Sequence, residues 1–324
     1  MKDTRLYIVI PCYNEEEVLP ETAKRIGALL TAMEERGRIS PESRIVFVDD
    51  GSRDATWRII AALAAEDRRM QGIKLARNAG HQNALLAGLL AVRSHCDCCI
   101  SIDADLQDDI QVIEAFVAKF DAGCDVVYGV RSRRQSDTRF KRATARGFYK
   151  IMRLLGADVV EDHADYRLMS KRALDALAEF PEVNLFLRGM VRLVGFQSGE
   201  VYYERAERFA GESKYPLKKM LSFAFDGITS FSIKPIRLVW GLGVAVCFLA
   251  VLAAVYTLCA RFFGVSVTGW SSLMISIWFL GGVQLVSVGV IGEYIGKIYK
   301  EVKRRPRYII CLLYTSPSPR DPKT

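Results

Sequence analysis

The chain has 324 residues, half of them hydrophobic, and its 45 Lys and Arg against 37 Asp and Glu give a formal net charge of +8. This length allows two domains or one large α/β domain, and the 25% share of charged residues excludes a mainly disordered or low-complexity protein. The apolar residues gather near the C-terminus, where two stretches of 23 and 31 residues carry no charge, which indicates a membrane hairpin behind a soluble-looking N-terminal part.

The first 130 residues alternate patterns typical of strands and helices. Apolar, β-rich runs are followed by segments with helical periodicity, which predicts an α/β fold: a mostly parallel sheet with helices on both faces. Ligands of such sheets bind outside the carboxyl ends of the strands. The expected strands are 6–10, 44–48, 72–75, 98–102 and 125–130, and the expected helices are 16–33, 56–65, 84–92 and 110–120.

Polar side chains gather where these expected strands end. Any one of them is explained as a solvated loop residue, but chance does not explain five strands in succession. We therefore expect a binding site along this edge of the sheet. The residues are Tyr13, Asn14 and Glu15 after the first strand, Asp49 and Asp50 after the second, Arg77 and Asn78 after the third, Asp103, Asp105 and Gln107 after the fourth, and Arg131 and Arg133 after the fifth.

Residues 131–210 are more polar and less regular, and no element is predicted there. The segment 213–231 has the pattern of an amphipathic helix, with Leu217, Leu221 and Phe225 on one face and lysines near its start. Its position before an apolar segment favours a helix lying at the membrane interface over an ordinary domain helix.

Two uncharged segments, 238–260 and 262–292, each exceed the roughly 20 residues that cross a bilayer. Basic residues precede the first and follow the second, whereas the loop between them carries only Arg261. The positive-inside rule then places both ends of the chain in the cytoplasm. The positive charge is explained by this topology and by anionic lipid, and no zinc finger or RNA-binding motif is present, so we expect no nucleic-acid partner.

These patterns divide the chain into five parts. The last fourteen residues have no periodicity and contain three prolines, so we expect them to lie outside the fold as a disordered or non-native tail. The parts are a cytoplasmic α/β domain over 1–212, an amphipathic juxtamembrane helix over 213–233, a two-helix transmembrane hairpin over 234–300, a basic cytoplasmic end over 301–310 and the tail over 311–324.

The motif Asp103-Ala104-Asp105 carries the clearest chemistry. Two carboxylates on a tight turn can hold a hard divalent cation, with Gln107 adding a neutral oxygen. Asp-x-Asp alone is a weak signal, but the preceding apolar strand and the run from Asp49 to Ser52 make it more specific. No Gly-x-Gly-x-x-Gly follows a strand and no P-loop is present, which disfavours a dinucleotide site and a P-loop enzyme.

Four ordered motifs resemble family 2 glycosyltransferases of GT-A fold, which is Rossmann-like. They are Ile8-Val-Ile-Pro-Cys-Tyr-Asn-Glu-Glu, Val48-Asp-Asp-Gly-Ser-Arg-Asp, Arg77-Asn-Ala-Gly-His-Gln-Asn-Ala and Ile102-Asp-Ala-Asp-Leu-Gln-Asp. The chain is further similar to polyprenyl-phosphate glycosyltransferases, namely bacterial undecaprenyl-phosphate (bactoprenol) glucosyltransferases and dolichyl-phosphate mannose synthases. The motifs that narrow it are Asp165-Tyr-Arg-Leu-Met-Ser, Asn184-Leu-Phe-Leu-Arg-Gly, Glu204-Arg-Ala-Glu-Arg-Phe-Ala-Gly-Glu-Ser-Lys-Tyr and Gly292-Glu-Tyr-Ile-Gly-Lys.

The resemblance implies a role for each matching residue. The chemistry agrees with these residue types, because an aromatic ring such as that of Tyr13 can stack on a base and the carboxylate of Asp50 can accept from uracil N3–H. The implied sites are Pro11, Tyr13, Glu15, Val48 and Asp50 for the nucleoside; Asp103, Ala104, Asp105 and Gln107 for the diphosphate and a Mg²⁺ or Mn²⁺ ion; Arg131 for donor phosphate; and Arg188, Arg205, Arg208, Ser213 and Lys214 for the acceptor phosphate.

The implied reaction is metal-dependent transfer of a sugar, most closely glucose from UDP-glucose, to undecaprenyl phosphate with inversion at the anomeric carbon. Asp105 and Asp165 are the implied catalytic residues. A phosphate monoester with a second pKa of about 6 is mostly ionised near neutral pH and needs no strong base. Asp165 is therefore a candidate either for a base or for a group that orients the acceptor. Relatives carry Gly before this Asp, whereas this chain carries Ala164.

The resemblance also implies a bacterial inner-membrane protein, a homo-oligomer such as a tetramer, and a product that serves cell-envelope or O-antigen glycosylation. Other donors stay open: GDP-mannose, UDP-N-acetylglucosamine, UDP-galactose and a UDP-4-amino-arabinose derivative. A processive polysaccharide synthase is disfavoured because the chain lacks a Gln-x-x-Arg-Trp motif and further spans. A non-catalytic scaffold or flippase partner is the alternative of another class.

Overall fold

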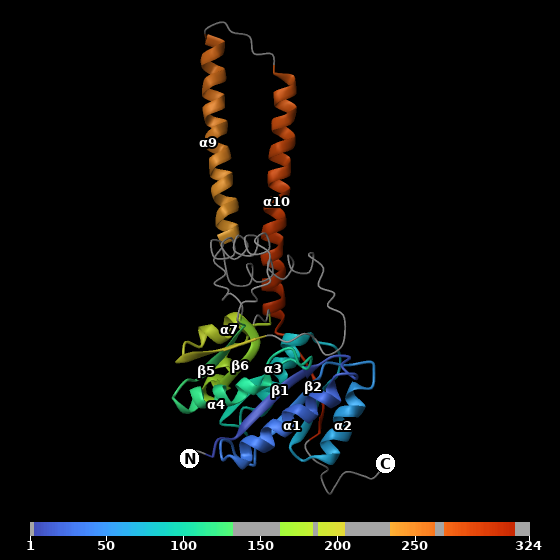
Figure 1. Cartoon of the computed structure of the whole chain (residues 1–324). Coiled ribbons are helices and arrows are strands. Elements are labelled where there is room, and N and C mark those ends of the chain that lie inside the picture. Colours follow the sequence, from blue (N-terminus) through green and yellow to red (C-terminus); the bar gives the residue numbers. More distant parts are fainter. Residues whose placement is uncertain (1–2, 132–162, 184–186, 205–233, 263–268, 315–324) are drawn as a thin grey trace. The chain divides into compact units, whose positions relative to one another are not determined.

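The computed structural model describes residues 3–131, 163–183, 187–204, 234–262 and 269–314. The chain divides into two compact units. The described part of the first unit comprises residues 3–131, 163–183, 187–204 and 305–314, and that of the second comprises the two long C-terminal helices and their ends (Figure 1).

An eight-stranded sheet lies at the centre of the first unit, in the order β7-β5-β6-β4-β1-β2-β3-β8. Antiparallel pairing is confined to β6 and β8, so the prediction of a mostly parallel sheet is confirmed. The parallel centre consists of β4 (Cys98–Ser101), β1 (Leu6–Cys12), β2 (Arg44–Asp49) and β3 (Met70–Leu75).

Two strands lie in the region where no element was predicted. The strand β6 (His163–Ser170) runs antiparallel between β4 and β5 (Val126–Arg131). The strand β7 (Ser198–Tyr203) pairs in parallel with β5 at one edge of the sheet. The sheet therefore extends well beyond the five strands that the sequence predicts.

Helices cover both faces of the sheet, as expected. Alternate residues of β1 divide between the faces: Leu6, Ile8 and Ile10 pack on one side, and Tyr7 and Val9 on the other. Burial on both faces explains why the central strands are continuous apolar runs. The first face holds α1 (Leu19–Glu35), α2 (Thr56–Glu66) and, after the 3₁₀ turn η1 (Ile110–Val112), α4 (Ile113–Asp121); the second holds α3 (His81–Val92), α6 (Lys171–Ala178) and α7 (Leu187–Leu193).

The strand order places a topological switch point at β1. The chain proceeds from β1 outward through β2 to β3 and then returns to place β4 on the other side of β1. Loops that leave neighbouring strands in opposite directions open a crevice at their carboxyl ends. The polar residues that follow β1 and β4 lie at these carboxyl ends.

The C-terminal segment corrects one expectation. Residues Ile310–Tyr314 form β8, which pairs antiparallel with β3. Ala76 N–H donates to the carbonyl of Ile309 at 2.9 Å, and the Arg307 guanidinium donates to the carbonyl of Phe180 at 2.8 Å. The expectation that residues from 311 onward lie outside the fold is therefore wrong for 311–314. The open hydrogen-bonding edge of β3 recruits a segment too short to show a strand pattern, and 315–324 lie outside the described residues.

The second unit contains α9 (Lys234–Phe262) and α10 (Trp270–Lys303), of 29 and 34 residues. Two segments, Lys234–Leu252 and Phe279–Lys303, are long and apolar enough to cross a membrane by length and composition. The helix α10 ends three residues beyond the predicted hairpin boundary at 300. The amphipathic helix predicted over 213–233 lies outside the described residues.

Gly88 of α3 fixes how closely that helix approaches the sheet. A Cβ atom there would lie 2.4 Å from Val9 Cγ1 and 2.7 Å from Val48 Cγ2, both fully buried. We expect Gly88→Ala to lower the free energy of unfolding by about 1–3 kcal/mol through overpacking, measured by denaturant unfolding of the full chain in detergent.

Gly27 of α1 is the matched control, because a Cβ there meets only the flexible end of Met70 at 3.4 Å. Gly27→Ala should leave stability unchanged or raise it by up to about 1 kcal/mol through helix propensity. Equal effects of the two substitutions would contradict the close packing of α3.

Candidate active site

The predicted site residues that the structure describes converge at the carboxyl ends of β1, β2, β4 and β5. Pro11 and Val48 are register partners on β1 and β2, and both are buried, so their side chains belong to the sheet. Tyr13 is 43% exposed directly after β1. Glu15 follows it, and its backbone N–H donates to Thr56 Oγ1 at 2.9 Å.

Asp50 organises the turn before α3. Its carboxylate is 2% exposed and accepts from the backbone N–H groups of Ala79 at 2.6 Å and Gly80 at 3.0 Å. Burial raises the pKa of Asp50. Gly51 has φ of +69°, and a Cβ there would lie 2.7 Å from the Asn78 nitrogen, so only glycine lets the two turns approach. Asp50 thereby places the first residue of α3, His81, at the site.

The Asp103–Gln107 turn follows β4. Burial raises the pKa of Asp103 to about 6; the nearby His81 opposes this shift, whereas the charges of neighbouring carboxylates add to it. Gln107 N–H donates to Asp105 Oδ1 at 3.2 Å, and Leu106 between them has φ of +55°. The carbonyl of Ala104 accepts from Thr22 Oγ1 of α1 at 2.8 Å, which ties the turn to the first helix.

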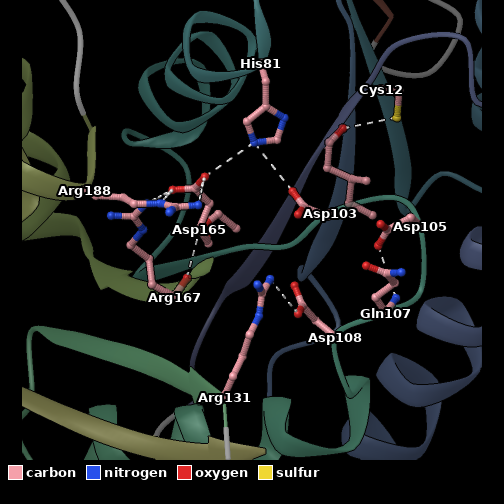
Figure 2. Close-up of polar contacts among 12 residues, drawn as sticks. Cys12, His81, Asp103, Asp105, Gln107, Asp108, Arg131, Asp165, Arg167 and Arg188 are labelled. Carbon is pink, nitrogen blue, oxygen red and sulfur yellow. Dashed lines mark hydrogen bonds and ion pairs between the residues drawn. The ribbon is translucent and has the colours of Figure 1, made fainter. Parts of the chain in front are cut away.

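Asp165 on β6 is the centre of an ionic cluster, shown in Figure 2. Its Oδ1 accepts from Arg167 at 2.5 Å, and Arg188 of α7 donates to both carboxylate oxygens at 3.2 Å. His81 Nε2 lies 3.7 Å from Asp165 Oδ2 and 3.5 Å from Asp103 Oδ1. The His81 imidazole therefore faces two carboxylates, that of Asp103 after β4 and that of Asp165 on the neighbouring strand β6.

The charges of this cluster shift its pKa values. Burial alone would raise the pKa of Asp165, but the contacts with His81, Arg167 and Arg188 outweigh burial and hold it well below its usual range. Burial opposes protonation of His81, yet Asp165 and Asp103 raise its pKa above the ordinary value. Asp165 is thus ionised near neutral pH and is a poor proton acceptor there.

A second cluster joins the turn after β4 to the ends of β5 and β7. Asp108 Oδ1 accepts from Tyr203 Oη at 2.6 Å and from Arg131 at 3.4 Å. Arg131 Nε also donates to Tyr203 Oη at 3.2 Å. Burial and the neighbouring Asp108 raise the pKa of Tyr203 well above its usual range, so its hydroxyl stays a hydrogen-bond donor.

Two residues that are predicted to bind phosphate therefore contact other side chains of the protein in this structure. Arg131 contacts Asp108 and Tyr203, and Arg188 contacts Asp165. Residues that the prediction missed are His81, Asp108, Arg167, Tyr166 and Tyr203; the first four lie inside or beside the quoted motifs, whereas nothing in the sequence marks Tyr203. Arg205, Arg208, Ser213 and Lys214 lie outside the described residues.

The donor set suits a hard divalent cation. Asp103, Asp105 and Gln107 offer oxygen ligands, and burial raises the pKa of Asp103. Within the described part of the chain, no group of three or more His, Cys, Asp and Glu is arranged to hold a metal ion alone. A cation here would complete its shell with water and ligand oxygens.

Removing the charge of Asp165 should strongly destabilise the protein. Asp165→Asn leaves the buried guanidinium of Arg167, 2% exposed, without its anionic partner. We expect a loss of about 3–5 kcal/mol in the free energy of unfolding at pH 7. The control is Glu114→Gln, which removes an exposed pairing with Arg36 and should cost at most about 1 kcal/mol.

Acidification tests the same contact. Because the folded-state pKa of Asp165 is depressed, its contribution is present above the unfolded pKa of about 4 and is lost as pH falls toward the folded pKa. The wild type should lose more stability than Asp165→Asn between pH 5 and pH 3, measured by thermal unfolding. Equal losses would contradict the depressed pKa.

Two family models match the chain. Residues 7–178 match the family model for glycosyl transferase family 2, and residues 234–298 match the model of the GtrB C-terminal hairpin. The chain is 55% identical to the uncharacterized glycosyltransferase YkoT of Bacillus subtilis (strain 168), covering 94% of this chain and 90% of that protein.

The chain is also similar to a curated relative and, at much lower sequence identity, to a solved structure. The chain is 43% identical to the SfII prophage-derived bactoprenol glucosyl transferase of Shigella flexneri, covering 94% of this chain and 97% of that protein. A crystal structure of glucosyl-3-phosphoglycerate synthase from Mycobacterium tuberculosis with Mn²⁺, UDP and glucosyl-3-phosphoglycerate has 18% identity and a TM-score of 0.46, covering 70% of this chain and 78% of that one. By the family model and these near full-length relatives, the chain belongs to glycosyl transferase family 2.

Proposed function

We propose that this glycosyltransferase moves a sugar from a nucleotide diphosphate to a polyprenyl phosphate. The observation that carries the proposal is that the acidic turn, Asp103 to Asp105, lies beside two carboxylates that hold arginines. Arg131 contacts Asp108, and Arg188 contacts Asp165, which faces the same His81 imidazole as Asp103. The near full-length similarity to a bactoprenol glucosyl transferase supports the choice of acceptor.

The donor side lies between the turns after β1, β2 and β4. The exposed ring of Tyr13 is available to stack on a base, while Asp50, which already accepts two backbone N–H groups, fixes the floor of the nucleoside site. Asp103, Asp105 and Gln107 would hold a Mg²⁺ or Mn²⁺ ion. When bound, such an ion neutralises charge that develops on the departing diphosphate.

The acceptor side lies at Asp165 and Arg188. The acceptor phosphate is already mostly ionised near pH 7, so transfer needs orientation of that phosphate more than proton removal. The depressed pKa of Asp165 supports an orienting role, in which Asp165 holds Arg188 and His81 in place. Attack from the face opposite the diphosphate inverts the anomeric carbon. Arg205, Arg208, Ser213 and Lys214 stay predicted acceptor ligands.

The apolar helices support a membrane setting. We propose that α9 and α10 cross the bacterial cytoplasmic membrane as a hairpin with both termini in the cytoplasm. Basic residues flank the hairpin, whereas Arg261 is the single charged residue between the two spans. A polyprenyl acceptor resides in that membrane. The tetramer and the use of the product in cell-envelope glycosylation stay predictions.

A donor panel tests the proposal. Purified full-length protein in lipid nanodiscs is mixed with undecaprenyl phosphate, Mn²⁺ or Mg²⁺, and one radiolabelled nucleotide sugar at a time. We expect labelled lipid, with UDP-glucose first among UDP-glucose, UDP-galactose, UDP-N-acetylglucosamine, a UDP-4-amino-arabinose derivative and GDP-mannose. Nucleotide-sugar binding without labelled lipid from any donor would support a scaffold or flippase partner instead.

Asp105→Asn should abolish transfer. The substitution removes one of two carboxylates available to a cation, and we expect a loss of at least about 100-fold in kcat/KM. Asp109→Asn is the matched control on the same turn, since its Oδ1 only accepts from Gln111 N–H at 2.9 Å and Asn caps equally well. The control should retain activity within about threefold; full activity of Asp105→Asn would refute its role.

A further inference from the structure

The acidic turn that carries Asp103 and Asp105 continues to Asp109, and hydrogen bonds from three other elements hold this segment. Thr22 of α1 donates to the carbonyl of Ala104 at 2.8 Å. Tyr166 of β6 donates to the carbonyl of Asp109 at 3.0 Å. Tyr203, the last residue of β7, donates to the carboxylate of Asp108 at 2.6 Å. Two of these contacts come from strands far along the chain.

The hydrogen bond from the Tyr203 hydroxyl is the shortest of these three, and the same hydroxyl also contacts Arg131. It accepts from Arg131 Nε at 3.2 Å, while Arg131 Nη2 lies 3.4 Å from Asp108 Oδ1. One oxygen atom therefore joins the acidic turn to the arginine at the end of β5. The Asp108 side chain is only 2% exposed, so water replaces the lost contact poorly.

Packing fixes where the Tyr203 ring lies. Tyr203 is 3% exposed and makes an edge-to-face contact with Tyr166 at 5.3 Å, and Tyr166 makes another with Phe116 at 4.8 Å. Gly129 of β5 leaves room for both rings, because a Cβ there would lie 3.1 Å from Tyr203 Cε1 and 3.2 Å from Tyr166 Cδ1. The hydroxyl is thus presented from a rigid aromatic stack.

The turn itself needs such support. Leu106, between the two ends of this turn, has φ of +55°, a region that non-glycine residues rarely adopt. Strained backbone of this kind persists where surrounding contacts determine it and is common at ligand sites. Loss of a neighbouring contact should let the turn relax and should move Asp105 with it.

We propose that Tyr203 is a positioning residue that holds the acidic turn and Arg131 in the arrangement that binds a divalent cation together with a nucleoside diphosphate. This inference rests on the proposed function. Tyr203 acts through Asp108 and Arg131 and needs no contact with the ligand. It makes β7, at the edge of the sheet, part of the donor site.

The test compares Tyr203→Phe with Tyr202→Phe in the full chain. Tyr202 is the adjacent residue, is 65% exposed, and donates only to Glu200, at 2.7 Å, so it controls for loss of a hydroxyl on the same strand. Hydrogen exchange of amides 104–109, measured without cation, should quicken in Tyr203→Phe alone. Mn²⁺ affinity with saturating UDP, measured by electron paramagnetic resonance of unbound Mn²⁺, should fall about tenfold, the effect of losing one hydrogen bond to a charged group.

The two readouts separate the possible failures. Unchanged exchange and unchanged Mn²⁺ affinity in Tyr203→Phe would overturn the inference while leaving the proposed function intact. Absence of Mn²⁺ binding by the wild type would overturn the proposed cation site and the cation part of this inference, and the exchange rates would still decide whether Tyr203 holds the turn. If Tyr203→Phe does not fold, Asp108→Asn weakens the same contact from the turn side, and unchanged exchange there would also overturn the inference.

Discussion

The site depends on the ion pairs that the carboxylate of Asp165 makes with Arg167 and Arg188. Asp103, Asp108 and Asp165 lie close together, and the two buried carboxylates, Asp108 and Asp165, are tolerated only because cations or hydrogen-bond donors face them. Arg188, Arg167 and His81 satisfy Asp165, and Arg131 and Tyr203 satisfy Asp108. Asp103 lies 3.5 Å from His81 Nε2, and burial raises its pKa.

The order of the strands explains how these groups meet. The antiparallel β6 pairs with β4, so Asp165 enters the sheet edge beside the turn that carries Asp103. The close approach of α3, allowed by Gly88, and the turn tied by Asp50 bring His81 to both carboxylates. The division of roles that we propose follows from this arrangement: Asp165 orders positive groups on the acceptor side, and Asp103 and Asp105 serve the donor side.

Much of the fold could be predicted because the central strands are buried on both faces and are therefore continuous apolar runs. The polar residues after β1, β2 and β4 were identifiable for the same reason, since they interrupt those runs. The strand β6 was missed because Asp165 and Arg167 interrupt its apolar pattern, and their mutual neutralisation becomes visible only when the chain folds. The edge strand β7 alternates exposed and buried residues over six positions, and β8 occupies five residues of a segment that otherwise has no pattern. The family resemblance assigned Arg131 and Arg188 to phosphate, and these roles stay predictions. Their contacts with Asp108, Tyr203 and Asp165 were not predicted, because a sequence does not reveal intramolecular partners.

A structure of the full-length protein with Mn²⁺ and UDP tests the division of roles most directly. The anomalous signal of manganese locates the ion independently of the protein atoms. We expect manganese bound by Asp103 and Asp105, with Asp165 still paired to Arg167 and Arg188. Manganese bound by Asp165, with its arginine contacts broken, would contradict this division of roles.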